Sequence, residues 1–86
     1  MIFVMLAKFR RKPRKEDVRR TPEILTKNGA KQTLAAFWTF GRYDAVLAFE
    51  ADNEDAAMKI ALEFSDLAST ETLIAVPREQ ALQLLD

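Results

Sequence analysis

Four consecutive residues, Gly-Arg-Tyr-Asp at 41–44, carry the side chains of this chain that are best suited to binding chemistry. They lie between two strand-like runs, 31–40 and 45–51, so the chain must reverse direction across them. A tight reversal needs a glycine and often an aspartate, but it needs neither an arginine nor a tyrosine. The tetrapeptide is therefore predicted to be both a hairpin connection and a candidate site.

Each polar side chain of this stretch has a functional interpretation and a structural one. Arg42 can hold an anion in bidentate fashion, or it can form a structural ion pair with Asp44 or Glu71. Tyr43 can present its phenol to a pocket. Asp44 can act as an acid or base, or it can accept backbone hydrogen bonds in the turn. The ligand-binding candidates are Trp38, Arg42, Tyr43, Asp44, Glu71 and Thr72.

The composition removes several classes of chemistry. The chain has no cysteine and no histidine, which excludes disulfides, thiol nucleophiles, and the usual zinc ligands and neutral-pH general base. We predict no metal site and no cofactor. Catalysis, if there is any, would depend on carboxylates, Tyr43, lysines, hydroxyls or a borrowed cofactor, and the sequence leaves open whether the protein is an enzyme.

The charges cancel overall but are distributed unevenly. Residues 8–31 hold ten basic and three acidic side chains, whereas residues 44–86 hold ten acidic and two basic ones. The basic run at 8–15 can bind phosphates, or it can be a solvated loop that complements the acidic half of a neighbouring subunit. Because the aromatic residues do not lie between the basic ones, no nucleic-acid partner is predicted.

The length of 86 residues indicates one domain, and 49% of the residues are apolar. The apolar segment 1–7 is too short to span a bilayer, which takes about 20 residues. It has no charged segment before it and no cleavage site after it, so it does not resemble a signal peptide. We interpret it as a strand, and we predict a cytoplasmic protein with no membrane partner.

The hydrophobic pattern predicts seven elements. Strands are expected at 2–9, 33–40, 45–51 and 70–76, and a second helix begins after a cap at Asp52 or Asn53. Pro77 opens a short final helix over 78–85. This order is that of a ferredoxin-like βαββαβ sandwich of the α+β class, with an added C-terminal helix.

The first helix is expected from about Arg14 to Asn28, with Val18 and Leu25 on its buried face. Pro22 leaves two alternatives, because proline in a helix interior removes a hydrogen bond. Either a long helix kinks there, which we favour, or Thr21 caps a shorter helix that starts at Pro22.

The first three strands are apolar on both alternating sets of residues. Helices cover one face of a ferredoxin-like sheet, so a second element must cover the other. We predict a second copy, packed sheet to sheet into a closed α+β barrel, which makes the chain its own partner in a homodimer. The alternative is that the C-terminal helix folds back across this face.

Several motifs together resemble the GYD domain family. They are Trp-Thr-Phe-Gly-Arg-Tyr-Asp at 38–44, Glu-Ala at 50–51 before an alanine-rich helix, and Thr-Glu-Thr-Leu at 70–73. The resemblance covers most of the chain, from the first strand through Pro77, and is weaker around Pro22. It implies the dimeric α+β barrel group of ferredoxin-like proteins and points to a site, but it implies no activity or substrate.

The predicted topology brings three segments to one end of the sheet, namely 9–15, 41–44 and 70–72. This favours a small-molecule binding module for an anionic or aromatic metabolite, built on the dimeric barrel. Two alternatives remain open, a structural protein that only forms oligomers and a cofactor-free enzyme that uses tyrosine and carboxylate acid-base chemistry.

Overall fold

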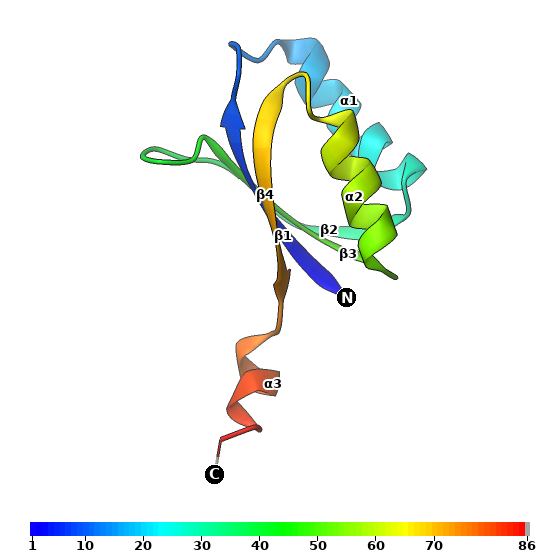
Figure 1. The fold of residues 1–86 in the computed structure, drawn as a ribbon, viewed down its shortest axis with the longest axis vertical. Coiled ribbons are helices and arrows are strands. Elements are labelled where there is room, and N and C mark those ends of the chain that lie inside the picture. The colour runs from blue at the N-terminus through cyan, green and yellow to red at the C-terminus, as the bar shows by residue number, and fades with distance from the viewer. Residues whose placement is uncertain (86) are drawn as a thin grey trace.

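The computed structural model describes residues 1–85 and contains one antiparallel sheet with helices against one of its faces (Figure 1). The predicted order of elements is confirmed. The elements are β1 (Ile2–Phe9), α1 (Lys15–Lys27), β2 (Ala30–Trp38), β3 (Ala45–Ala51), α2 (Glu54–Glu63), β4 (Ala68–Ala75) and α3 (Arg78–Leu82).

The sheet has the strand order β2-β3-β1-β4, which is the ferredoxin-like arrangement. β1 occupies a central position and pairs antiparallel with both β3 and β4. Its residues therefore lie opposite partners on both sides, with Phe3 beside Phe49 and Ile74. Because both neighbours run antiparallel to β1, the end of β1 lies beside the starts of β3 and β4.

The hydrophobic core lies between the sheet and the helices α1 and α2. Phe3, Phe49 and Ile60 are the largest fully buried side chains. The rings of Phe3 and Phe49 stack across the β1–β3 pair with centroids 5.6 Å apart. Along β1, β3 and β4, side chains of one parity thus face this core, and side chains of the other parity point to the opposite face.

Helix α1 is a single helix that contains Pro22, so the longer of the two alternatives holds and the shorter one is wrong. The Thr21 hydroxyl donates to the Asp17 carbonyl at 2.9 Å, one turn back. The buried residues of the helix are Ile24 and Leu25. Val18, which we predicted to be buried with Leu25, is 53% exposed, because it borders a pocket instead of packing in the core.

The boundaries of α1 and α2 follow the capping signals. α1 ends at Lys27 with Asn28 as its C-cap, and Gly29 follows with φ of 100°, a positive value that favours glycine. The Asn53 side chain caps α2 by accepting a hydrogen bond from the Ala56 amide at 3.1 Å. The predicted cap is thus confirmed at Asn53.

Strand β2 begins and ends earlier than predicted. It stops at Trp38, so the reversal to β3 spans the six residues 39–44 instead of a four-residue turn. The pairing with β3 also shifts register between Thr33 and Ala35. This irregularity breaks the simple alternation that we predicted along β2, because Thr33 pairs with core residue Phe49 while Ala35 pairs with Ala48 on the other face.

The face of the sheet opposite the helices carries no covering element within residues 1–85, and we call it the open face. α3 has no buried residue and extends beyond the end of β4, so the alternative in which it covers this face is wrong (Figure 1). It ends at Leu82, three residues before the predicted end. The side chains of the open face are mostly apolar: Ile2, Val4, Leu6, Ala35, Phe37, Val46, Ala48, Leu73 and Ala75.

Within residues 1–85, no helix combines the length and the apolar character that a membrane crossing requires.

Candidate functional site

The loop 39–44 between β2 and β3 is tied to the end of β1 by the backbone and side chain of Asp44. The Asp44 amide donates to the Ala7 carbonyl at 2.8 Å, and its Oδ2 accepts from the Phe9 amide at 2.8 Å. Asp44 therefore fulfils the structural interpretation, although its partner belongs to β1 and not to its own turn. Within the loop, the Thr39 hydroxyl donates to the Tyr43 carbonyl at 2.7 Å.

Tyr43 and Glu71 form the shortest side-chain hydrogen bond at this end of the sheet. The Tyr43 phenol donates to Glu71 Oε1 at 2.6 Å and joins residues far apart in sequence. Hydrogen bonding to the carboxylate, helped by partial burial, raises the pKa of Tyr43 above its usual value of 10.0. At neutral pH the phenol is therefore a hydrogen-bond donor and not a base.

Arg42 does not reach Glu71, which corrects the pairing that we considered from the sequence. Its guanidinium carbon lies 5.8 Å from the centre of the Tyr43 ring, at cation–π distance. In the part of the chain that the structure describes, Arg42 makes no ion pair. The Tyr43 phenol bonds to the Glu71 carboxylate instead, so the Arg42 guanidinium can bind a ligand.

Lys8 joins this group of side chains. It has the same parity along β1 as Leu6, and Leu6 lies opposite Glu71, so Lys8 and Glu71 both belong to the rim of the open face. Lys8 Nζ lies 3.5 Å from the Arg42 carbonyl oxygen. We call Lys8, Arg42, Tyr43 and Glu71 the rim cluster. Sequence reasoning assigned Lys8 only to the basic run, although the alternation of β1 was the signal that places it here.

The other predicted site residues lie on the opposite side of the sheet. Thr72 pairs with Met5, a core residue, so it belongs to the helix-covered face. Trp38 packs edge-on against Phe9 with ring centroids 5.6 Å apart. The six candidates are therefore divided between the two faces, and Asp44 holds the strands together between them.

A pocket of about 300 Å³ opens on the helix-covered face, between α1 and the sheet. We call it the α1–sheet pocket. It shares only Trp38 with the predicted site residues and includes none of the rim cluster. Its walls are apolar except for a few side chains. The lining includes Phe9, Pro13, Val18, Trp38, Leu47 and Leu67, with Asp17, Thr21 and Thr70 as polar members.

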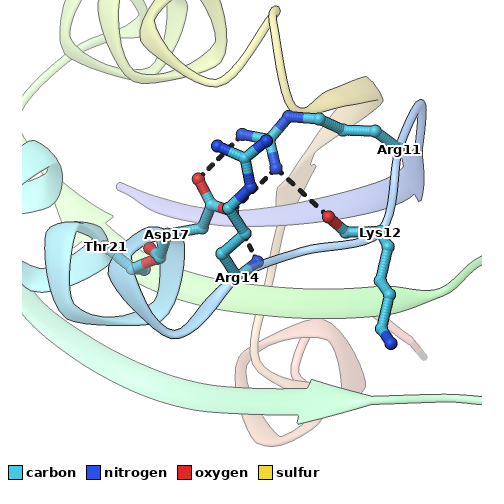
Figure 2. Close-up of polar contacts among 5 residues, drawn as sticks. All are labelled: Arg11, Lys12, Arg14, Asp17 and Thr21. Atoms are coloured by element: carbon cyan, nitrogen blue, oxygen red, sulfur yellow. Dashed lines mark hydrogen bonds and ion pairs between the residues drawn. The ribbon is translucent and has the colours of Figure 1, made fainter.

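The basic loop before α1 is partly used for structure, as Figure 2 shows. Arg11 forms a bidentate pair with both carboxylate oxygens of Asp17, each at 2.9 Å, and Asp17 also accepts from the Arg14 amide at 2.7 Å. These bonds hold the pKa of Asp17 far below its usual range. On the other side of the loop, Arg10 Nε donates to the Ser65 carbonyl at 2.9 Å.

Comparisons with known proteins agree with this geometry at the level of the fold. The family model of the GYD domain matches residues 4–85. A search of curated proteins finds no match. Among solved structures, the hypothetical protein PHS023 from Pyrococcus horikoshii is similar with a TM-score of 0.55 and 16% identity, over 88% of this chain and 90% of that one.

A second similar structure is AsnC from E. coli, with a TM-score of 0.54 and 19% identity over 87% of this chain. The match covers 50% of the AsnC chain, so this chain spans about half the length of that protein. At these identities the likeness shows a shared fold and no shared ligand or activity.

Proposed function

The chain belongs to the GYD domain family, and on that premise we propose that it is a small-molecule binding module formed by two copies packed open face to open face. The ligand in this proposal is an anionic metabolite, with an aromatic or other apolar body. It enters the interior between the sheets, and the rim cluster recognises its charged group. We place this module in the cytoplasm.

The open face supports the dimer because it presents a row of apolar side chains without a cover. Phe37 and Leu73 are 63% and 43% exposed in the single chain. Burial contributes about 25 cal/mol per Å² of apolar surface removed from water, so several hundred Å² per subunit would give many kcal/mol of gross driving force. Contiguous apolar surface of this kind marks an interaction site more often than a solvated face.

The rim cluster carries the proposal for the ligand. It holds two cationic side chains, Lys8 and Arg42, against the single carboxylate of Glu71, and the Tyr43 phenol is bonded to that carboxylate at 2.6 Å. The excess of positive charge favours an anion. The ring of Tyr43 and the apolar open face beside it favour an apolar or aromatic body.

Binding can be tested with a panel of aromatic and aliphatic carboxylates, first by thermal shift and then by titration calorimetry of the compounds that stabilise the protein. We expect Arg42→Ala to weaken the best ligand by about tenfold or more, since a charge-assisted hydrogen bond contributes about 1.5–3 kcal/mol. Arg78→Ala is the matched control, because Arg78 lies on α3 away from the rim. If no acid in the panel stabilises the protein, the ligand proposal fails.

A structural role is the second candidate, and Asp44 favours it. Both its amide and its carboxylate serve the fold, so part of the family motif needs no ligand to explain it. In a purely structural protein, Arg42→Ala would dissociate the oligomer. In a binding module, the same variant would remain a dimer and lose only the anion.

A cofactor-free enzyme has less support. The raised pKa of Tyr43 keeps its phenol protonated at neutral pH, which suits a donor that positions Glu71 or a ligand and does not suit a general base.

A further inference from the structure

The α1–sheet pocket includes none of the rim cluster, and of the open-face residues only Phe37 and Val46 belong to its lining. Nothing in the proposed function uses this pocket. At about 300 Å³ it reaches the lower end of the range for small-molecule sites. Most of its lining lies on the helix-covered face, so the sheet-to-sheet dimer would leave that part of the pocket in place. A ligand of this pocket must therefore be inferred from the residues that line it.

The chemistry of the walls specifies most of the ligand. Of the polar side chains that line the pocket, Asp17 is already bonded to Arg11 and the Arg14 amide, and the Thr21 hydroxyl donates to the Asp17 carbonyl. Apart from Thr70, the remaining walls are aliphatic and aromatic, and Trp38 and Val18 are both more than half exposed. A long apolar body fits such walls better than a polar one.

Two lysine side chains provide positive charge close in sequence to the pocket lining. Lys12 and Lys15 lie in sequence on either side of the wall residue Pro13, and within residues 1–85 neither makes an ion pair. Figure 2 shows that the Lys12 side chain extends away from the Arg11–Asp17 network. Two lysines without acidic partners beside an apolar pocket suit an anionic head group.

We propose that the α1–sheet pocket is a second ligand site, which binds an amphipathic carboxylic acid with its apolar chain between α1 and the sheet and its carboxylate toward Lys12 and Lys15.

Trp38 is the only tryptophan in the chain and a wall of the pocket, so its fluorescence reports occupancy directly. Decanoate is the probe, and decanol, with the same chain length and no charge, is its comparison. We expect saturable changes in Trp38 emission with both, and tighter binding of decanoate. The Lys12→Ala/Lys15→Ala variant should weaken decanoate about two- to fivefold and leave decanol unchanged, as expected for exposed charge pairs.

Val18→Phe places a larger side chain in the wall of the pocket and should weaken both probes about tenfold, because the added ring would occupy space that the bound chain needs. Lys59→Ala on α2 is the matched charge control and should change nothing. Far-ultraviolet circular dichroism confirms that each variant is folded.

Three results would overturn this second site. The first is the absence of any saturable change in Trp38 emission with either probe. The second is decanoate binding that Tyr43→Phe abolishes and Val18→Phe spares, which places the acid at the rim cluster. The third is a change of oligomeric state in Val18→Phe, which means that a second copy fills the pocket. Loss of ligand at the rim cluster alone would leave this proposal standing.

Discussion

At the scale of single residues, the molecule separates side chains that hold the fold from side chains that remain available. The carboxylates of Asp44 and Asp17 both accept hydrogen bonds that hold the fold, the first from β1 and the second from the loop before α1. Arg42 and Lys8 have no acidic partner within the described residues. We identify the rim cluster by these cations without acidic partners, and not by the mere presence of charged residues in a motif.

Tyr43 offers a direct test at this scale, because it is the only tyrosine in the chain. A spectrophotometric titration of the phenol should give a midpoint above the usual value of 10.0, since the bond to Glu71 favours the protonated form. Glu71→Gln should bring the midpoint back toward that value.

The same shift predicts a pH dependence of stability. Because the folded pKa of Tyr43 lies above the unfolded one, its contribution is fully present below pH 10.0 and is lost as the pH rises through the folded pKa. Tyr43→Phe should remove this part of the alkaline loss, as measured by urea unfolding over that range. An unchanged midpoint in the Glu71→Gln titration would contradict the Tyr43–Glu71 bond.

At the scale of elements, the sequence predicts the features that depend on residues close together in the chain. The cap at Asn53, the end of α1 before Gly29 and the apolar run of β1 are local signals, and all three are found. The end of β2 is not determined by a local signal. It depends on the register with β3 and on the bulge near Leu34, which no single-strand alternation reveals.

The sequence predicts which segments meet at this end of the sheet, but it does not predict which side chains bond to one another. Antiparallel topology alone brings 41–44 and the start of β4 to one end of the sheet. The partner of the Glu71 carboxylate depends on the direction of the side chains around it. In the structure Tyr43, and not Arg42, bonds to Glu71. The α1–sheet pocket was not predicted at all, because its walls come from α1 and from several strands that only the tertiary structure brings together.

The cap of α2 gives a prediction at the element scale. Asn53→Ala should lower the free energy of unfolding by about 1 kcal/mol, because the Ala56 amide loses its acceptor. Asn53→Ser retains a capping oxygen and should cost little. Urea unfolding at one fixed protein concentration measures both, since the stability of the proposed dimer would depend on concentration. Equal loss in the two variants would argue against the cap.

At the scale of the whole molecule, the shape of the single chain points to a missing cover. Both helices of the core lie on one side of the sheet, and α3 extends away from it (Figure 1). The open face therefore combines apolar side chains along β1, β3 and β4 with a charged rim at one end. In our proposal, a second copy would cover the apolar part of this face and would leave the rim cluster at the mouth of the interior.

Sedimentation equilibrium at micromolar concentration tests this account most directly, with Val4→Lys as a variant that places a charge in the middle of the open face. We predict that the native protein sediments at twice the 9.8 kDa chain mass, and that the variant remains folded but shifts toward the single-chain mass. A native protein that is well folded and sediments at 9.8 kDa would contradict the account.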